Sequence, residues 1–405
     1  MNITVQKFGG TSVGTPERIK AVADRVSELK KTTPHIVVVV SAMGDTTDEL
    51  IALSHRISET PNPREYDALI STGENISAAL LAMALQNLGV LAISLTGPQA
   101  GVATSGHYGR SKIVDVDTKR ILHELSLGNV VVVTGFQGIN DALDVTTIGR
   151  GGSDTSAVVL AAALGAGVCE IFTDVDGVYT TDPRKVKSAS KLSEISYEEM
   201  LELASLGAKV LHPRAVECAK ENGIVIHVRS SFDRVEGTLV KEAAAMEVNR
   251  PVTGVTMNED EAQISILNIP DSPGVAGQIF SELADAAVNV DMIIQTVQEN
   301  GFNKISFTVS VDDLQQAKTV TSNVGARLKA SGVQFDDAIA KISIVGVGMM
   351  SKPGVAAKFF KTLGDNGINI RMISTSEIKV SCVIDKADGP RALELLHAVF
   401  ELDRL

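Results

Sequence analysis

The sequence predicts an α/β chain in which a mainly parallel sheet sandwiched by helices spans residues 1–240 and two copies of a smaller β-α-β-β-α unit follow. Three observations lead to this prediction. Short β-branched runs alternate with helical patterns, most runs end in a loop rich in Gly, Ser and Thr, and the stretch that begins at residue 272 recurs at residue 352. Such alternation is typical of a sheet buried on both faces.

Composition narrows the class of protein. The 405 residues are 44% hydrophobic with a formal net charge of −12, which predicts a sizeable core, two or three domains and no nucleic-acid partner. Cys169, Cys218 and Cys382 are far apart, which argues against a disulfide framework or a zinc site and fits a reducing cytosol. The start MNITVQ is unlike a signal peptide, and the apolar stretches fall short of the roughly 18 residues of a membrane helix. We therefore expect a cytoplasmic protein with no membrane partner.

Six runs in the first 240 residues have the composition of strands. After the first run, Thr15 and Pro16 suit the N-cap and first position of a helix. Ligands bind beyond the carboxyl ends of strands in open α/β sheets, so the polar loops should converge on one crevice. Ordinary βα turns are the alternative for any single loop. The runs are 3–8, 35–42, 90–97, 129–136, 169–176 and 224–230.

The C-terminal part repeats itself. Pro273 matches Pro353 and Asn289 matches Asn369, an offset of 80 in both cases (353 − 273 and 369 − 289). We expect a linker and strand at 241–260, one copy at 261–337 and the other at 338–405. The second copy stops on its last helix, so we expect a strand near 251–257 to close its sheet and interlock the copies.

Two glycine-rich loops have the chemistry of anion sites. In VQKFGGTSVG, Gly9 and Gly10 allow close approach of an anion and can aim N–H groups at it, while Lys7 arrives from the strand end. A plain turn with a surface lysine is an equal alternative. In TIGRGGSDTSA, glycines precede Ser153 and Asp154, good N-cap residues, and Arg150 can donate to a carboxylate or phosphate. A helix that is simply capped is the alternative here.

Four further stretches are weaker signals on their own. FTDVDGVYTTDPRKV offers ribose acceptors, a ring for stacking and Arg184 for phosphate, and its acidic spacing fails as an EF-hand. Glu74 in STGE suits an ammonium group or simply a helix dipole. In SAMGDTTDEL, hydroxyls could donate to a carboxylate or simply cap a helix. In LGAKVLHPRA, Lys209 is a candidate phosphate cation, and His212 before a proline is more often structural.

Together these stretches resemble the amino acid kinase family, and within it the aspartate kinases. KFGGTSV, SAMGDTTD, STGE, GRGGSDTSA, FTDVDGVYTTDPR and KVLHPRA occur in the family's order, and the resemblance covers essentially the whole chain. The paired C-terminal units, with NIRMISTSE at 369–377, resemble ferredoxin-like βαββαβ ACT modules that sense end-product amino acids. The resemblance implies ATP-dependent phosphorylation of the β-carboxylate of L-aspartate, with Mg²⁺ accompanying ATP and no protein-held metal site.

The resemblance also implies residue roles. Lys7 and Asp154 would be catalytic, with Asp154 organising lysines and metal-bound phosphates. The residues implied at aspartate are Ser41, Thr47, Glu74, Arg150, Gly151, Gly152 and Ser153. Those implied at ATP are Lys7, Phe8, Gly9, Gly10, Thr173, Asp174, Tyr179, Arg184, Lys209 and Val210. Those implied at an inhibitory lysine or threonine are Asp271, Gly274, Val275, Ala276, Asp291, Met292, Ile293, Ile294, Gln295, Gln298, Asn369, Ile370 and Thr375.

The resemblance further implies a homo-oligomer built through the ACT modules. An α2β2 form with a subunit from an internal start is also open, since Met246 and Met257 lie where such a start would occur. Two other functions are alternatives for this sequence. A kinase of the same family could act on glutamate, carbamate or a nucleotide. A non-catalytic amino-acid sensor would be expected to lack one or more of Lys7, Arg150, Asp154 and Lys209, and all four are present.

Overall fold

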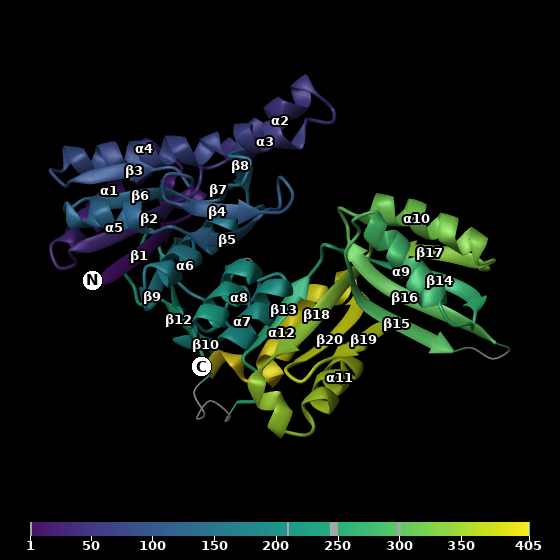
Figure 1. Cartoon of the computed structure of the whole chain (residues 1–405). Helices are drawn as coiled ribbons and strands as arrows, with labels where there is room; N and C mark the ends of the chain where they lie inside the picture. Colours follow the sequence, from purple (N-terminus) through teal and green to yellow (C-terminus); the bar gives the residue numbers. More distant parts are fainter. Residues whose placement is uncertain (1, 209, 244–249, 298–300, 405) are drawn as a thin grey trace. The chain divides into compact units, whose positions relative to one another are not determined.

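Two units divide the chain (Figure 1). The computed structural model describes residues 2–208, 210–243, 250–297 and 301–404. Unit 1 comprises Met1–Tyr179 and Lys191–Ala245, and unit 2 comprises Thr180–Ser190 and Met246–Leu405. A short segment from the middle of the sequence is therefore part of unit 2.

Unit 1 is built on an eight-stranded sheet of order β10-β12-β11-β9-β1-β2-β6-β3. The strands are parallel apart from the β11–β12 pair, which confirms the predicted α/β class. The central strand β1 ends level with its neighbours, because Phe8 is in register with Val40 and Phe172, and Val40 with Thr134. The strands are β1 (Ile3–Phe8), β2 (His35–Val40), β3 (Ala92–Leu95), β6 (Val130–Thr134), β9 (Val168–Thr173), β10 (Glu194–Ser196), β11 (Val225–Ser230) and β12 (Thr238–Lys241).

Helices cover both faces of this sheet (Figure 1). On one face α1 and α4 pack over Phe8, Ile36 and Val38, and on the other α6 contacts β1, β2 and β9. Thr15 caps α1 by accepting from the Arg18 N–H, and Pro16 is its first residue, as the sequence predicts. The helices are α1 (Pro16–Lys30), α2 (Thr46–Ile57), α3 (Pro63–Ile70), α4 (Thr72–Asn87), α5 (Lys119–Ser126), α6 (Gly152–Ala163), α7 (Tyr197–Ser205) and α8 (Pro213–Asn222), with the 3₁₀ turn η1 (Gly10–Val13).

A second, small sheet in unit 1 has the order β5-β4-β7-β8. Asp67 on α3 is fully buried and ties this sheet down. Its carboxylate accepts from the Gly109 N–H at 2.9 Å and from both the N–H and the hydroxyl of Thr147 at 2.8 Å. These strands are β4 (Val102–Ser105), β5 (Lys112–Val116), β7 (Gln137–Ile139) and β8 (Val145–Thr147).

Unit 2 contains the two predicted repeats, each with a four-stranded antiparallel sheet and two helices. Module 1 has the order β15-β16-β14-β17, with strands β14 (Glu261–Pro270), β15 (Val290–Val297), β16 (Phe302–Ser310), β17 (Gly332–Asp336) and helices α9 (Val275–Asp285) and α10 (Leu314–Arg327). Module 2 has the order β13-β18-β20-β19, with strands β13 (Gly254–Asn258), β18 (Ile339–Val345), β19 (Met372–Thr375), β20 (Lys379–Asp385), helices α11 (Val355–Asp365) and α12 (Gly389–Val399), and 3₁₀ turns η3 (Val347–Ser351), η4 (Lys386–Asp388) and η5 (Leu402–Arg404).

The two modules correspond strand for strand. Strand β13 occupies in module 2 the edge that β17 occupies in module 1, although β13 precedes module 1 in the sequence. In each module a buried serine pair bridges the two central strands, Ser265 with Ser306 at 2.8 Å and Ser343 with Ser381 at 2.7 Å. The duplication inferred from the sequence therefore extends to individual hydrogen bonds at equivalent positions of the two modules.

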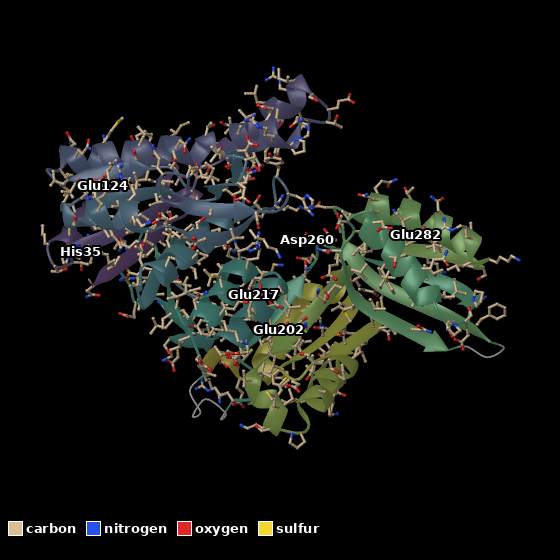
Figure 2. The ribbon with its side chains drawn as sticks, viewed as in Figure 1. His35, Glu124, Glu202, Glu217, Asp260 and Glu282 are labelled. Atoms are coloured by element: carbon tan, nitrogen blue, oxygen red, sulfur yellow. The ribbon has the colours of Figure 1, made fainter. Side chains whose placement is uncertain are left out.

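The side chains labelled in Figure 2 lie on both units. Acidic side chains lie on unit 1, such as Glu124 and Glu217, and on unit 2, such as Asp260 and Glu282.

The expectation of no stretch long enough for a membrane helix needs one correction. Within the described chain, Pro63–Asn87 meets that test by length and composition, because α3 and α4 run on through Ser71, and half of its most apolar window is buried.

Candidate functional site

The loops that follow the central strands of unit 1 meet at one edge of the sheet. Backbone hydrogen bonds join them in series: Gly9 N–H donates to Phe172 O, Ser41 N–H to Phe8 O, and Gly135 N–H to Val40 O. Ser231 N–H similarly donates to the Thr173 carbonyl at 2.9 Å. This is the edge at which open α/β sheets bind ligands.

Lys7 and Asp154 form an ion pair at this edge. Side chains alternate along β1, so Phe8 packs in the α1–α4 core while Lys7 points to the opposite face, where α6 lies. Lys7 Nζ is 2.6 Å from Asp154 Oδ1, and the two side chains are only 11% and 13% exposed. The Asp154 carboxylate therefore compensates the charge of the nearly buried Lys7 ammonium group.

The two glycines after β1 lie in tight surroundings. A Cβ on Gly9 would lie 3.3 Å from Lys7 Nζ, and one on Gly10 would lie 3.0 Å from the Ala42 carbonyl. The expectation that both glycine N–H groups face an anion is wrong for Gly9, whose N–H donates to Phe172 O. The turn η1 begins at Gly10, so the Gly10 N–H is the first amide of this turn.

Glu74 provides a buried carboxylate that is only partly satisfied. It lies inside the first turn of α4, which begins at Thr72. Its Oε1 accepts from the Ala42 N–H at 3.1 Å, whereas the buried Oε2 receives no hydrogen bond from the part of the chain that the structure describes. Burial raises the pKa of Glu74 to about 7. A cationic group beside Oε2 would give this oxygen a hydrogen-bond partner and would lower the pKa of Glu74.

Ser41 and Thr47 lie in the adjacent segments. Ser41 follows β2 and its carbonyl accepts from the Ser77 hydroxyl of α4 at 2.7 Å, which ties this loop to the helix that carries Glu74. Thr47 is in the first turn of α2, and both Ser41 and Thr47 are half-buried. The structure thus brings Ser41 close to the Glu74 helix.

The loop before α6 departs from its prediction. Ser153 and Asp154 are not N-cap residues, because α6 begins at Gly152 and its N-cap is Gly151 with φ +69°. A left-handed residue is needed there, and a Cβ at this position would lie 2.0 Å from His212 Cγ. Arg150 is exposed beside it. Both Ser153 and Asp154 are therefore placed in the first turn, where the helix dipole is positive.

Sequence reasoning missed two residues that hold this loop. The Arg214 guanidinium donates to the carbonyls of Ile148 at 2.6 Å and Ser111 at 3.4 Å. Asp67, described above, fixes Thr147 two residues before Gly149. His212 takes the structural role predicted for it, since its Nδ1 accepts from the Arg214 N–H and caps α8. The one available signal for these two residues was Asp67, an acidic residue that lies three positions before Ile70, the other buried residue of α3.

The residues expected at a nucleotide lie beyond β9. The Thr173 hydroxyl donates to Asp174 at 3.0 Å, and the Tyr179 hydroxyl donates to Asp176 at 2.9 Å. Val210 is half-buried before α8, and Lys209 lies outside the described residues. Arg184 lies in the segment that belongs to unit 2 and forms two hydrogen bonds of 3.0 Å with Asp182.

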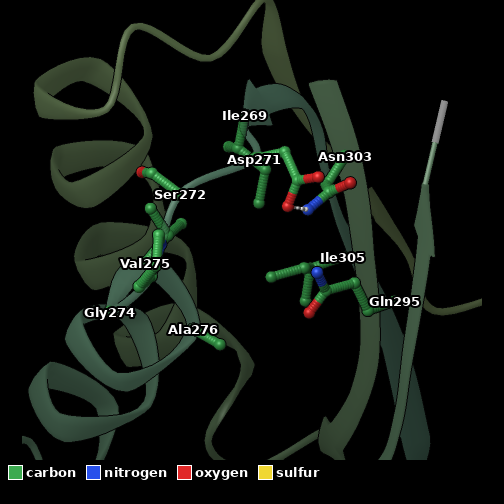
Figure 3. Close-up of a pocket in the computed structure, with 10 residues that line it drawn as sticks. Ile269, Asp271, Ser272, Gly274, Val275, Ala276, Gln295, Asn303 and Ile305 are labelled. Carbon is green, nitrogen blue, oxygen red and sulfur yellow. Dashed lines mark hydrogen bonds between the residues drawn. The ribbon is translucent and has the colours of Figure 1, made fainter. Parts of the chain in front are cut away.

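Unit 2 has a cavity of about 330 Å³ in module 1 (Figure 3). Ten residues line it, among them five expected at an effector, namely Asp271, Gly274, Val275, Ala276 and Gln295. Asp271 is held by Asn303, whose amide donates to it at 2.8 Å. Figure 3 shows Gln295 pointing into the cavity from the strand opposite Asp271.

The other residues expected at an effector lie away from this lining. Asp291 pairs instead with Lys341 of module 2, Met292 and Ile294 pack in a small cluster with Met372, and Ile293 is exposed. Asn369 and Ile370 precede β19, Thr375 ends it, and Gln298 lies outside the described residues.

Family models match most of the chain. The model of the amino acid kinase family matches residues 2–230, and ACT domain models match residues 262–326 and 342–400. An aspartokinase of Bacillus sp. (strain MGA3) is 52% identical over 99% of this chain and 98% of its own length. An aspartokinase of Thermus thermophilus is 49% identical over the full length of both chains.

Solved structures agree with these matches. Aspartokinase III of E. coli in complex with aspartate and ADP is 26% identical, with a TM-score of 0.82 over 98% of this chain and 99% of that chain. The same enzyme in complex with lysine and aspartate is 27% identical, with a TM-score of 0.77 and the same coverage. The first complex contains aspartate and ADP, and the second contains lysine and aspartate.

The Gly151→Ala variant tests whether the loop before α6 needs its glycine. The added Cβ would both strain a left-handed residue and collide with the His212 ring, so we expect lowered thermal stability and displaced Arg150 and Ser153. Gly165→Ala is the matched control, since its φ is +67° and a Cβ there would meet no atom of the described chain within 4 Å. Thermal unfolding should show a loss of about 1 kcal/mol in the control and a larger loss in Gly151→Ala. Equal losses would contradict the collision.

Proposed function

This chain belongs to the aspartokinases of the amino acid kinase family, and from that premise we propose that the strand-end crevice of unit 1 is its catalytic site. Its reaction transfers the γ-phosphoryl group of ATP to the β-carboxylate of L-aspartate, giving ADP and 4-phospho-L-aspartate. This is the first step of lysine, threonine and methionine biosynthesis, with feedback inhibition by lysine or threonine at the ACT modules. The observation that carries the site assignment is the nearly buried Lys7–Asp154 pair at the end of β1.

The acceptor needs no general base. A carboxylate with an ordinary pKa near 4 is already ionised at pH 7, so the β-carboxylate can attack the γ-phosphorus directly and in line. Catalysis then depends on alignment and on spreading negative charge from the phosphoryl oxygens onto positive groups. In this assignment Lys7 meets the transferring group, and Asp154 holds the ammonium in place.

The substrates would occupy neighbouring parts of the crevice. Oε2 of Glu74 would accept from the α-ammonium of aspartate, and Arg150 would bind its α-carboxylate. Ser41, Thr47 and the Gly151–Ser153 segment would complete that pocket. Phe8, Gly9, Gly10, Thr173, Asp174, Tyr179, Arg184, Lys209 and Val210 would hold ATP. Both complexes of E. coli aspartokinase III contain aspartate, which supports a pocket of this kind.

Mg²⁺ would accompany ATP. Among the described residues, no group of three or more His, Cys, Asp or Glu could hold a metal ion. The phosphate oxygens of ATP would hold it, with Asp154 as the neighbouring protein carboxylate. It would supply neutralisation of phosphate charge.

The module 1 cavity would take the inhibitory amino acid. An amino acid needs one acceptor for its ammonium and donors for its carboxylate, and Asp271 faces Gln295 across the cavity, with the start of α9 beside them. Asp291–Ile294, Gln298, Asn369, Ile370 and Thr375 are proposed to act where modules of two subunits meet. We place the protein in the cytoplasm as a homo-oligomer through these modules, with the α2β2 form as the alternative.

A hydroxamate assay with ATP and L-aspartate tests the reaction, with threonine and lysine added singly and together. Lys7→Ala should lower kcat at least ~100-fold, the size typical of removing one charge contact in the transition state. Lys7→Met keeps the stem and should lose as much, which separates loss of charge from loss of packing. Lys20→Ala on the exposed side of α1 is the control. Folded Lys7 variants with near-normal turnover would disprove the assignment.

The raised pKa of Glu74 predicts a pH-dependent affinity for aspartate. Binding of an ammonium needs the ionised carboxylate, so the KM for aspartate should fall about tenfold between pH 6 and pH 8 as a group with a pKa of about 7 ionises. Glu74→Gln should have a higher KM with no such slope. Without substrate, a raised carboxyl pKa means that the folded state binds the extra proton, so stability should fall as pH rises from about 4.5 to 7. An unchanged KM in Glu74→Gln would remove it from the pocket.

Substitutions in the module 1 cavity test the proposed inhibition by an amino acid bound there. Asp271→Ala and Gln295→Ala should each raise the concentration of lysine or threonine that gives half-inhibition about tenfold, while kcat without effector stays near normal. Ser351→Ala is the control, because Ser351 lies 80 residues after Asp271 (351 − 271) at the matching position of module 2. Isothermal titration would measure binding directly, and unaltered inhibition in both cavity variants would contradict the proposal.

A further inference from the structure

The segment 147–150 of unit 1 joins strand β8 of the small sheet to helix α6. It begins at Thr147, the last residue of β8, and ends at Arg150, which directly precedes the N-cap Gly151. Thr147 and Ile148 are fully buried, whereas Arg150 is exposed. Arg150 is assigned above to the α-carboxylate of aspartate. An exposed substrate-binding arginine is thus carried by a segment whose first two residues are buried.

Asp67 on α3 holds the start of this segment. Its fully buried carboxylate accepts from the Thr147 N–H and the Thr147 hydroxyl at 2.8 Å each, and from the Gly109 N–H at 2.9 Å. The Ser111 N–H donates to the Thr147 carbonyl at 3.0 Å. Buried N–H groups are costly to leave without an acceptor, so removal of the carboxylate would release both Thr147 and Gly109. One side chain therefore fixes the residue with which the segment begins.

Arg214 on α8 holds the next residue from a different helix. Its guanidinium donates to the Ile148 carbonyl at 2.6 Å and to the Ser111 carbonyl at 3.4 Å. The Ile148 N–H donates to the Phe136 carbonyl at 2.9 Å, so both backbone groups of Ile148 are bonded. Helices α3 and α8 both belong to unit 1. Two helices of one unit thus hold consecutive residues of the segment.

Only Gly149 separates these held residues from Arg150. Its φ is +83°, and a Cβ at this position would lie 3.0 Å from the Gly109 carbonyl, so the backbone passes close to the neighbouring loop. The Gly149 carbonyl accepts from the Gly152 N–H at 3.0 Å, which ties it to the first residue of α6. The backbone of Arg150 is therefore placed by bonds on both sides of it.

We propose that Asp67 and Arg214 are positioning residues for aspartate: they hold the segment 147–150 so that Arg150 meets the α-carboxylate of the substrate. The inference rests on the proposed function, which assigns Arg150 to that group. Asp67 is fully buried, and the Arg214 guanidinium donates to backbone carbonyls, so both act through the segment. The residues assigned to ATP lie on other segments. Loosening this segment should therefore weaken aspartate binding selectively.

Steady-state kinetics of full-length variants test this selectivity. Asp67→Ala and Arg214→Met should each raise the KM for aspartate about tenfold, while the KM for ATP stays within about twofold. Asp67→Asn should restore the KM, because its amide oxygen can accept from both N–H groups and its NH₂ can donate to the Thr147 hydroxyl. Glu124→Ala is the control, since Glu124 is 5% exposed and accepts from Asn129 beyond α5. It should lower thermal stability and leave both KM values unchanged.

A double-mutant cycle shows whether the two residues act through Arg150. If they do, adding Asp67→Ala to Arg150→Ala should raise the KM for aspartate less than twofold beyond that of Arg150→Ala alone. Effects that simply multiply would overturn the inference. So would an unchanged KM for aspartate in both Asp67→Ala and Arg214→Met, or a parallel change of kcat, both KM values and thermal stability, which would indicate a purely structural role. Arg214→Met carries the same test if Asp67→Ala does not fold.

Arg150→Ala alone separates this inference from the proposed function. If it raises the KM for aspartate and neither Asp67→Ala nor Arg214→Met does, the inference fails and the assignment of Arg150 stands. If those two variants raise the KM and Arg150→Ala does not, the segment keeps its positioning role and Arg150 leaves the aspartate pocket.

Discussion

The level ending of five parallel strands is the constraint on which the site depends. Phe8, Val40 and Thr134 are in register with one another and end their strands, and Phe172 is in register with them one residue before β9 ends. Ser230 ends β11 in register with Thr173, the last residue of β9, so the loops that follow emerge at one edge and bond to one another. A one-residue slip of β1 would exchange the faces of Lys7 and Phe8 and remove the ammonium from α6. The position of the Lys7 ammonium group is thus set by the register of the sheet and not by the loops.

This geometry answers the electrostatic problem of an acidic protein that must bring two anions together. Lys7 alone would be a nearly buried, unpaired cation, and its ion pair with Asp154 compensates that charge. Glu74 is the opposite case: its Oε2 has no partner among the described residues, and burial raises its pKa to about 7. The charge of Lys7 is therefore compensated by a neighbouring side chain, whereas Oε2 of Glu74 receives no such compensation from the described part of the chain.

Local sequence predicted the parts of the fold and site that depend on local physics. The cap and proline of α1, the duplicated modules and the structural role of His212 are confirmed by the structure. The N-cap of α6 was wrong because Ser and Asp are good caps in general, while close packing against His212 selects glycine here. Asp67 and Arg214 were missed because they act on partners 42 to 103 residues away, and no local pattern encodes such bonds.

The two modules differ in what they need from the rest of the chain. Module 1 supplies its own edge strand, β17, whereas module 2 takes β13 from before module 1 and Val186 from the middle of the catalytic part. Module 1 also contains the amino-acid-sized cavity. Since Lys341 of module 2 pairs with Glu261 and Asp291 of module 1, a ligand that shifts β15 acts on a charge cluster shared with module 2. The duplicated modules have therefore diverged: module 1 contains a cavity, and module 2 is packed against the segment that carries Arg184.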